Sequence, residues 1–301
     1  MKAIRYDEHG GPEVLQIVEV DPPRAGPGEV RIVVRAAGVN PSDWKRREGR
    51  YRAFEDVRFP AGLGVEGAGV VDQLGPGVTD VAVGDAVFGF GEATMAGQAI
   101  LTLWARKPEA LSFAGAAALP VVCDTATRAL DQVGVEPGQT LLVSGAAGGV
   151  GSAILQLARL REIAVIGTAS PANHDYLRAL GAVPTAYGPG LAARVRGLAP
   201  GGVDAAIDVA GSGIIPELIA IVGRPSRVLS VADVSAERYG ARFCHGPPVD
   251  PAGLLAAMAG LCARGAFAMH IDRRFPFDQA IAAQIVSQRG HATGKLVVEF
   301  G

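Results

Sequence analysis

The chain of 301 residues contains only three cysteines and no long apolar run. Cys123, Cys244 and Cys262 are odd in number and widely spaced, which argues against a disulfide framework, and each is expected to pack as a small buried hydrophobe. No apolar stretch approaches the length of a membrane-spanning helix, and the first residues, MKAIRYDEHG, lack the apolar centre of a signal peptide. These absences predict a cytoplasmic protein with no membrane partner.

The sequence also lacks a clear excess of positive or negative charge. The chain has 28 Lys and Arg against 30 Asp and Glu, a formal net charge of −2. Such a balance provides no general attraction for nucleic acid or for an anionic membrane, so neither is expected as a partner. Hydrophobic residues make up 49% and charged residues 19%, which is typical of a globular protein with one large core or two modest ones.

The most informative stretch is TLLVSGAAGGVG, residues 140–151, which continues into the helical pattern SAILQLARL. A strand, a loop of small residues and a helix in this order predict a dinucleotide site, because a helix N-terminus offers unpaired N–H groups to a pyrophosphate. Ala146, Gly148 and Gly151 take the three glycine positions of the fingerprint. Gly148 would let the backbone approach the phosphates, and Gly151 would let the helix pack closely on its strand. The predicted contacts are Ala147, Gly148, Gly149, Val150 and Gly151.

The pattern of predicted secondary structure changes near Leu119-Pro120. Before this point, short β-branched segments punctuated by Gly and Pro indicate a compact, irregular β domain. These segments are 29–39, 67–75 and 85–90. After this point, strands and helices alternate, which favours a parallel sheet covered on both faces.

The predicted strands of the second region are 140–144, 163–168, 203–209 and 227–231, and the predicted helices lie near 150–161, 173–180, 191–198 and 213–222. Gly181 is a suitable left-handed cap for the second of these helices. Beyond residue 247 we expect a further helix, a strand over 267–275, a helix from Asp278 and a last strand over 295–300.

Several phrases occur in the order found in one family: GGPEVLQIVEV, AAGVNPSDWKRREG, GVEGAGVVDQLGPGVTDVAVGDAVFG, ALSFAGAAALP, GAAGGVG and GHATGKLVV. Over essentially its whole length the chain resembles the zinc-independent quinone oxidoreductase branch of the medium-chain dehydrogenase/reductase superfamily. The resemblance implies an α/β fold, in which a Rossmann domain with a doubly wound parallel sheet (119–246) is inserted into a GroES-like irregular β catalytic domain (1–118 and 247–301). It also implies that cofactor and substrate meet between the two domains, and that the protein is a homodimer.

Two zinc ligands of the metal-dependent relatives are replaced here. Asn40 stands where those relatives carry a cysteine, and Val65, in Gly64-Val65-Glu66, stands where they carry a histidine. The four clustered cysteines of a structural zinc lobe are also absent from the sequence. We therefore expect no metal, and an acceptor that is already electron-poor, because nothing obvious would stabilise an alkoxide.

The choice between NADPH and NADH depends on the end of the second strand of the Rossmann domain, about two dozen residues past the first fingerprint position. An Asp or Glu there would repel a 2′-phosphate, whereas this chain has Ser170, which favours NADPH. Further candidates are Thr168, Asn173, His174 and the more distant Arg178. Alternatively, Ser170 and Asn173 only cap the following helix, and His174 is a solvated surface residue.

Other cofactor contacts follow from the resemblance. The loops after the fourth and fifth strands, with Asp208, Ala210 and Val231, would lie on the nicotinamide side, although Asp208 could equally have a structural role. Thr125 matches a threonine near the nicotinamide in the family. Lys295, together with Asn40, lies in a segment that approaches the cofactor from the catalytic domain.

The predicted reaction is hydride transfer from NADPH to a quinone or to an activated carbon–carbon double bond. Tyr51 is the candidate proton donor or carbonyl-polarising group, and Asn40 is the second catalytic candidate. Alternatively, Tyr51 is only a surface or packing aromatic. Relatives of the bacterial quinone reductase type carry two tyrosines in this segment, and Lys45 stands at one of those positions. This departure leaves room for an enone or a specialised enoyl thioester or polyketide intermediate as the substrate, or for a cofactor-binding protein with little turnover.

The run KRREGRYR, residues 45–52, is strongly basic. It could attract an anionic acyl carrier or CoA thioester, although such runs are more often solvated faces. A zinc-dependent alcohol dehydrogenase is the least favoured alternative, because of the ligand replacements. The expected partner is a small-molecule quinone or enone.

Overall fold

The computed structural model describes residues 1–53, 55–246 and 249–301 and divides the chain into two compact units. Unit 1 comprises Met1–Val121 and Asp250–Gly301, and unit 2 comprises Val122–Val249. The sequence predicts a first boundary after residue 118. The second predicted boundary, at residue 247, lies outside the described residues.

Unit 2 is built on one sheet of parallel strands in the order β10-β9-β8-β11-β12-β13. The strands are β8 (Thr140–Ser144), β9 (Ala164–Thr168), β10 (Val183–Thr185), β11 (Ala205–Asp208), β12 (Val228–Ser230) and β13 (Arg242–Phe243). The chain proceeds outward from β8 to β9 and β10, and then returns to continue from β11 on the other side of β8. This reversal makes the sheet doubly wound, so the predicted fold class is confirmed.

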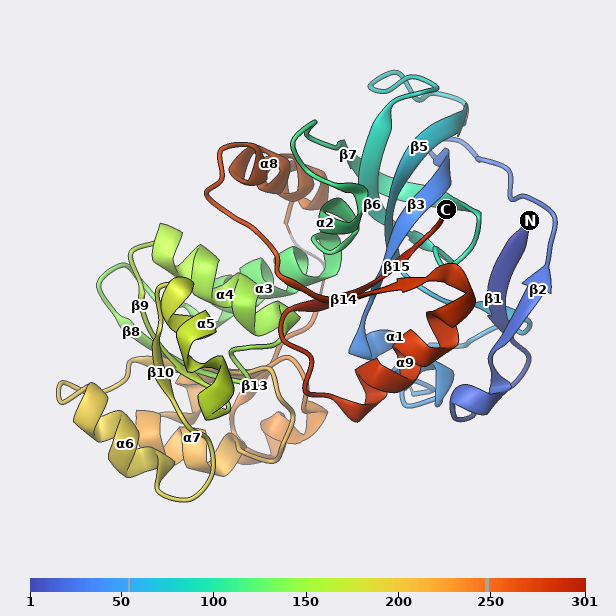
Figure 1. Cartoon of the computed structure of the whole chain (residues 1–301). Helices are drawn as coiled ribbons and strands as arrows, with labels where there is room; N and C mark the ends of the chain where they lie inside the picture. The colour runs from blue at the N-terminus through green and yellow to red at the C-terminus, as the bar shows by residue number, and fades with distance from the viewer. Residues whose placement is uncertain (54, 247–248) are drawn as a thin grey trace. The chain divides into compact units, whose positions relative to one another are not determined.

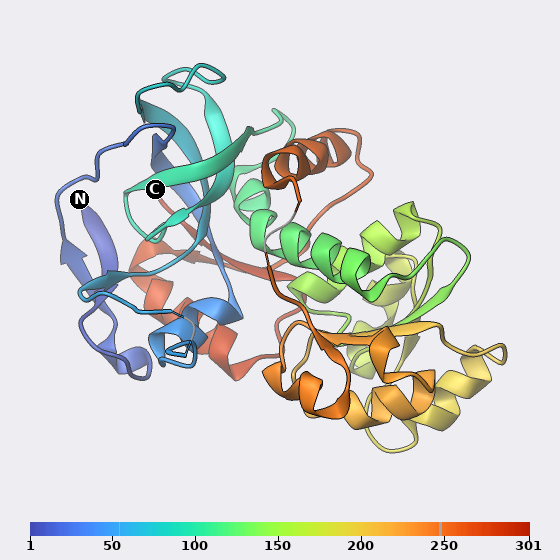
Figure 2. The ribbon, with the colours of Figure 1, turned by 180° about the vertical axis from the view of Figure 1, so that it is seen from behind.

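Helices cover both faces of this sheet, with α4 and α5 on one side and α6 and α7 on the other (Figures 1 and 2). Their bounds are α3 (Pro120–Val133, which begins at the end of unit 1), α4 (Gly149–Leu160), α5 (His174–Ala179), α6 (Leu191–Leu198) and α7 (Ile215–Val222). The 3-10 turns are η2 (Pro171–Asn173), η3 (Pro225–Arg227) and η4 (Val234–Tyr239). Because both faces are covered, a strand such as β8 is a continuous apolar run rather than an alternating one. Gly181, after α5, has φ +93°, the left-handed conformation that the sequence predicts.

Unit 1 contains a sheet in the order β14-β15-β3-β5-β6-β7, in which β3 also pairs with β7 and so closes β3, β5, β6 and β7 into a barrel. Its strands are β3 (Val30–Val39), β5 (Glu66–Leu74), β6 (Ala86–Glu92), β7 (Gln98–Arg106), β14 (Ile271–Pro276) and β15 (Lys295–Glu299). A smaller antiparallel sheet has the order β2-β1-β4, with β1 (Lys2–Tyr6), β2 (Gln16–Glu19) and β4 (Ala61–Gly62).

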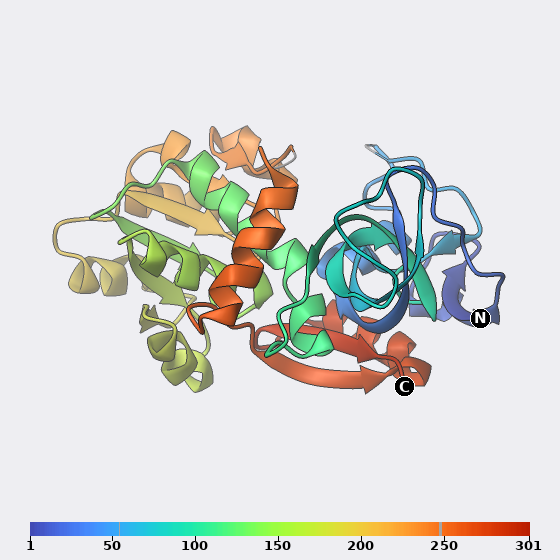
Figure 3. The same ribbon diagram turned by 90° about the horizontal axis from the view of Figure 1, so that it is seen from above.

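The last strand of the chain returns to the first part of unit 1. β15 lies parallel to β14, as Figure 3 shows, and antiparallel to β3, with Leu296 opposite Val39. This register brings Lys295 to the end of β3, beside Asn40. Two distant parts of the sequence therefore meet at this end of the sheet.

The helices of unit 1 are α1 (Pro41–Arg47), α2 (Phe113–Ala117), α8 (Pro251–Ala263) and α9 (Ala280–Arg289), with 3-10 turns η1 (Pro12–Val14) and η5 (Phe277–Gln279). α1 packs against α9, and a core that includes Tyr6, Met95, Ala280 and Ala283 lies close to them. No helix in the described part of the chain is both long and apolar enough to span a membrane. Cys123 and Cys244 are buried, Cys262 is partly exposed, and all three are thiols.

Some predicted element bounds were wrong. β14 begins at Ile271 rather than at residue 267, and the helix expected from Asp278 starts as one 3-10 turn before α9 begins at Ala280. β10 and β13 were not predicted at all. They contain three and two residues, too few to produce a period in the sequence.

Candidate active site

In unit 2, the glycine-rich loop joins β8 to α4. Gly145 has φ +77°, which glycine adopts without strain. The loop is tied to the end of β9, because Gly145 N–H donates to Thr168 Oγ1 (3.2 Å) and Ala146 N–H donates to Thr168 O (3.0 Å). Helix α4 begins directly after Gly148, so its first N–H groups stand at the carboxyl edge of the sheet.

The two glycines at the start of α4 have different surroundings. A Cβ atom added at Gly151 would lie 2.5 Å from Gly145 O and 2.7 Å from Ala146 Cα, so this glycine is required by the protein's own packing. A Cβ atom at Gly148 would meet only Gly145 O, at 3.6 Å, an ordinary contact. The packing of the described residues therefore does not explain Gly148. Open space beside a helix N-terminus fits a phosphate of a dinucleotide.

The loop after β9 holds Ser170, Asn173 and His174. The side chains of Ser170 and Asn173 make no capping hydrogen bond to the helical turns that follow them, so the capping alternative is wrong for these two residues. His174 is half-buried, and its Nε2 is buried without a hydrogen-bond partner among the described residues, so it is not a fully solvated side chain. Arg178 is exposed and pairs with Asp175 at 2.6 Å.

Tyr187 is a candidate that the sequence analysis missed. It follows β10, which lies beside β9, and Ala169 N–H donates to Thr185 O at 3.0 Å where the two strands end. The loops after β9 and β10 are therefore neighbours, and Tyr187 is 58% exposed there. The sequence analysis could have identified Tyr187 only if it had predicted β10 correctly.

Asp208 organises the loops that follow β11 and β12. Its Oδ1 accepts hydrogen bonds from Ala210 N–H (3.1 Å) and Gly211 N–H (3.2 Å), and its Oδ2 accepts one from Ser230 Oγ (2.8 Å). Ser230 Oγ in turn accepts from Ala232 N–H at 3.1 Å. The fully buried Asp208 carboxylate thus points into the protein, in the structural role that the sequence left open, and a cofactor contact by its side chain stays a prediction.

The other predicted nicotinamide-side residues of unit 2 lie at or near this edge. Ala210 is exposed, and Val231 is half-buried and donates its N–H to Asp208 O at 2.9 Å. Thr125 lies in α3 and is half-buried. The parallel topology brings Ala147–Gly151, Ala210 and Val231 to one edge because the carboxyl ends of β8, β11 and β12 are adjacent. Their contacts with a cofactor stay predictions.

In unit 1, Asn40 and Lys295 meet at a buried glutamate. Lys295 Nζ donates to Glu66 Oε1 (2.7 Å), Asn40 Oδ1 (2.6 Å) and Val39 O (3.1 Å). Asn40 Nδ2 donates to Glu66 Oε1 (2.7 Å), and Val121 N–H donates to Glu66 Oε2 (2.7 Å). Glu66, Asn40 and Lys295 are 0%, 2% and 3% exposed. The cluster is a fully hydrogen-bonded ion pair.

This geometry limits what Asn40 and Lys295 can do. The Lys295 ammonium has three N–H donors, and all three are used within unit 1. A direct hydrogen bond from Lys295 to a cofactor would therefore replace one of them, so the roles of Lys295 and Asn40 at the cofactor stay predictions. The sequence analysis did not assign Glu66 a role. Its position after Gly64-Val65, where zinc-dependent relatives carry a histidine and a glutamate, was the available signal.

Tyr51 follows α1, is partly buried, and accepts a hydrogen bond at its backbone oxygen from Glu55 N–H (2.8 Å). Burial raises the pKa of its hydroxyl, and the charges of Asp43 and Glu55 raise it further. The phenol is thus protonated at neutral pH and can donate a hydrogen bond or a proton.

The basic run 45–52 is largely neutralised. Arg46 pairs with Glu55 (2.6 Å), Arg50 pairs with Glu48 (2.7 Å), and the Arg50 guanidinium lies over the Trp44 ring, 4.7 Å from its centroid. Arg47 is fully buried. This arrangement does not support the alternative that the run attracts an anionic substrate.

No group of three or more His, Cys, Asp or Glu side chains able to hold a metal ion occurs among residues 1–53, 55–246 and 249–301. At the position of the zinc ligands in metal-dependent relatives, the Glu66 carboxylate is already paired with Lys295. The donor set therefore does not fit a tetrahedral zinc site.

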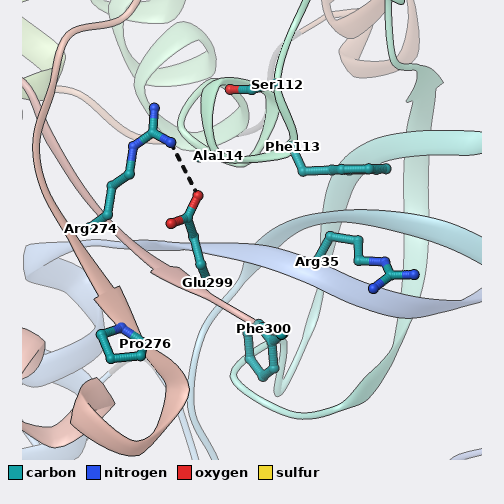
Figure 4. A pocket seen from close by; sticks show the side chains of 9 residues that line it. Arg35, Ser112, Phe113, Ala114, Arg274, Pro276, Glu299 and Phe300 are labelled. Atoms are coloured by element: carbon teal, nitrogen blue, oxygen red, sulfur yellow. Dashed lines mark hydrogen bonds and ion pairs between the residues drawn. The ribbon is translucent and has the colours of Figure 1, made fainter.

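A cavity of about 560 Å³ lies elsewhere in unit 1, between β3, the ends of β14 and β15, and the start of α2 (Figure 4). Arg274 reaches across to Glu299 at 3.3 Å on one wall, and Arg35, Phe113 and Phe300 lie on the others. None of the predicted site residues lines this cavity.

Comparison with known protein families identifies both parts of the chain. Residues 26–129 match the family described as "Alcohol dehydrogenase GroES-like domain", and residues 185–298 match the family described as "Zinc-binding dehydrogenase". A solved structure of mycobacterial Rv1454c complexed with NADPH superimposes with a TM-score of 0.86 at 28% identity, covering 99% of this chain and 100% of that one.

Two curated relatives differ greatly in length. The chloroplastic quinone oxidoreductase QR1 of Triphysaria versicolor is 32% identical over 323 aligned positions, which cover 99% of this chain and 98% of QR1. The pikromycin polyketide synthase component PikAII of Streptomyces venezuelae is 47% identical over 163 positions, 53% of this chain but only 4% of that protein. The chain thus spans a small part of PikAII and nearly all of QR1. It belongs to the medium-chain dehydrogenase/reductase superfamily of oxidoreductases, among the quinone oxidoreductase-like members.

Proposed function

We propose that this protein is an NADPH-dependent reductase that transfers a hydride to a quinone or an α,β-unsaturated carbonyl compound without a metal ion. The observation that carries the proposal is the open space beside Gly148 at the N-terminus of α4, at the carboxyl edge of a doubly wound sheet. Ligands of such sheets bind at this edge, where the strand order reverses.

The preference for NADPH is argued from the loops after β9 and β10. Ser170 stands where an acidic side chain would repel a 2′-phosphate, and its hydroxyl does not cap the turn that follows it. His174 and the exposed Tyr187 are further polar groups in these loops. The mycobacterial structure complexed with NADPH supports this choice.

In the proposed reaction, NADPH supplies the hydride when bound. The chain's own residues position the acceptor, exclude water and provide the proton. Tyr51 is the proton donor, because burial keeps its hydroxyl in the phenol form. The Glu66–Lys295–Asn40 cluster holds the end of β3 and the start of α1 rigid through its buried hydrogen bonds.

The test is to follow the absorbance of NADPH and of NADH with the purified protein in the presence of 1,4-benzoquinone, 9,10-phenanthrenequinone and a simple enone. We expect saturable oxidation that depends on the acceptor and is faster with NADPH. Tight NADPH binding without oxidation in the presence of any acceptor would contradict the proposal, and would favour a cofactor-binding protein with little turnover.

A second candidate function is the reduction of an enoyl thioester. The 47% identity to part of a polyketide synthase component favours it. The lysine at position 45, where quinone reductases of the bacterial type carry a tyrosine, also leaves room for this substrate. Crotonyl-CoA and crotonyl-N-acetylcysteamine, added to the same assay, decide between the two: a higher kcat/KM with these thioesters than with the quinones would establish the second function.

A further inference from the structure

The proposed binding of NADPH leaves its 2′-phosphate without a positive partner. A phosphate monoester carries about −1.5 to −2 charges at pH 7, and cationic side chains are its strong partners. Between Ala169 and Gly190, which include the loops after β9 and β10, the only acidic or basic side chains besides His174 are Asp175 and Arg178. These two pair with each other at 2.6 Å. The segment itself therefore supplies no unpaired lysine or arginine.

Arg194, near the start of α6, binds the loop after β10. Its Nη1 donates to Pro189 O (2.8 Å), and its Nη2 donates to Ala186 O (2.9 Å) and Gly188 O (3.0 Å). Gly188 has φ +86°, a left-handed conformation that lets successive carbonyl groups turn toward one guanidinium. The loop 186–189 therefore curves around the end of the Arg194 side chain.

The positive charge of Arg194 is not neutralised by these contacts. All three acceptors are uncharged carbonyl oxygens, and Arg194 forms no ion pair with a carboxylate among the described residues. Its Nε is buried and has no hydrogen-bond partner in the described part of the chain. Because a guanidinium stays protonated at any ordinary pH, Arg194 places a full positive charge in the loop after β10.

The Arg194 guanidinium lies near the residue where we propose the 2′-phosphate. Ala169 N–H donates to Thr185 O at 3.0 Å, so the carboxyl ends of β9 and β10 are side by side. Ser170 directly follows Ala169, and Ala186, whose carbonyl binds Arg194, directly follows Thr185. Ser170 and Ala186 are therefore each the next residue after a hydrogen-bonded pair, and the charge of Arg194 lies beside the loop that contains Ser170.

We propose that Arg194 determines the preference for NADPH over NADH, through the attraction between its unneutralised charge and the 2′-phosphate. This inference rests on the proposed use of NADPH. The carbonyl groups hold the guanidinium in place before the cofactor binds, so little conformational entropy is lost on binding. NADH has a hydroxyl group in place of the phosphate, so Arg194 acts on the choice between the cofactors and not on the affinity for their common part.

The test measures the binding of NADPH and of NADH to the purified protein by isothermal titration calorimetry, without any acceptor. In Arg194→Gln the ratio of the Kd for NADH to that for NADPH should fall by about tenfold, the scale of one charge beside a phosphate in surroundings of intermediate polarity. The Kd for NADH should stay within about twofold of wild type. A role limited to holding the loop would weaken both cofactors equally, and this result overturns the proposal.

The matched control is Arg196→Gln. Arg196 lies two residues further along α6, is exposed, and makes no hydrogen bond or ion pair among the described residues. The control removes the same charge from the same helix and should leave the ratio unchanged. Arg194→Lys keeps the charge without the planar fork of the guanidinium and should keep most of the preference. Equal losses in Arg194→Lys and Arg194→Gln, or in Arg196→Gln and Arg194→Gln, contradict the role assigned to the charge of Arg194.

The effect of salt gives a test on the wild-type protein alone, should Arg194→Gln not fold. The preference for NADPH should fall as NaCl rises from about 50 mM to about 500 mM, because salt screens the attraction between the two charges. A preference that does not depend on salt overturns the proposal.

The binding data also separate this inference from the proposed reductase function. If no acceptor is reduced but wild type prefers NADPH and Arg194→Gln does not, the reductase function fails while the role of Arg194 stands. If acceptors are reduced and Arg194→Gln keeps the wild-type preference, the role of Arg194 fails while the reductase function stands. If wild type binds NADPH and NADH equally well, the choice of NADPH and the role of Arg194 fail together.

Discussion

The candidate sites of the two units consist of different kinds of chemical groups. In unit 2 the site consists of backbone N–H groups, glycines and small side chains at the edge of a parallel sheet. In unit 1 it consists of ionisable side chains, Glu66, Lys295 and Asp43, that are almost completely buried. The site in unit 2 needs open space at the carboxyl edge of its sheet. The site in unit 1 needs each buried charge to be neutralised or paired. The difference predicts that substitutions in unit 1 act mainly on stability and proton supply, and that substitutions in unit 2 act on binding of the cofactor.

The strongest test of this comparison is Lys295→Met. It leaves the buried Glu66 carboxylate without its cation, so we expect a loss of about 3–5 kcal/mol in the free energy of unfolding, measured by urea denaturation. Arg274→Gln breaks the exposed Arg274–Glu299 pair and serves as the control, with an expected loss of about 0–1 kcal/mol. Similar losses in the two variants would show that burial of the ion pair does not matter.

The second test adds charge in unit 2. Ser170→Asp places a carboxylate where we propose the 2′-phosphate of NADPH, and like charges in contact cost binding energy. We expect the ratio of kcat/KM for NADPH to that for NADH to fall by about tenfold or more, since tenfold corresponds to 1.4 kcal/mol. Ser170→Ala, which adds no charge, should change this ratio much less. An unchanged preference in Ser170→Asp would place the phosphate elsewhere.

The third test concerns the dependence of stability on pH. Folding raises the pKa of Asp43 to about 7, so the native state binds this proton more tightly than the unfolded chain does. The stability that this protonation contributes is present below the ordinary aspartate pKa and is lost as the pH rises through about 7. Asp43→Asn should therefore gain stability relative to wild type between pH 5 and pH 8, by an amount on the order of 2 kcal/mol. Thermal unfolding curves at the two pH values measure this difference, and a constant difference would contradict the raised pKa.

The sequence predicted most of unit 2 because its signals are local. The run 140–151 contains the strand, the loop and the helix start within one segment, so the edge beside Gly148 could be located without a structure. β10 and β13 could not be predicted, because strands of three and two residues are too short to show a hydrophobic periodicity. Tyr187 was missed for the same reason, since its place depends on β10.

The site in unit 1 depends on pairing between distant segments. Lys295 reaches Glu66 and Asn40 only because β15 pairs with β3. Nothing in the local sequence shows that Asp43 is buried. Likewise, the inward direction of the Asp208 carboxylate follows from the loops around it rather than from its place at the end of a strand.

The most direct test of the central claim compares acceptor-dependent NADPH oxidation by the wild-type protein, Gly148→Val and Gly197→Val. Valine at Gly148 fills the space beside the N-terminus of α4, whereas Gly197, on α6, has open space around it and no proposed role. We predict a fall in kcat/KM of about 100-fold for Gly148→Val, roughly 2.7 kcal/mol of lost transition-state stabilisation, with the rate of Gly197→Val close to wild type. Full activity in a folded Gly148→Val protein would contradict the account, because the phosphates would then not lie where the structure leaves room for them.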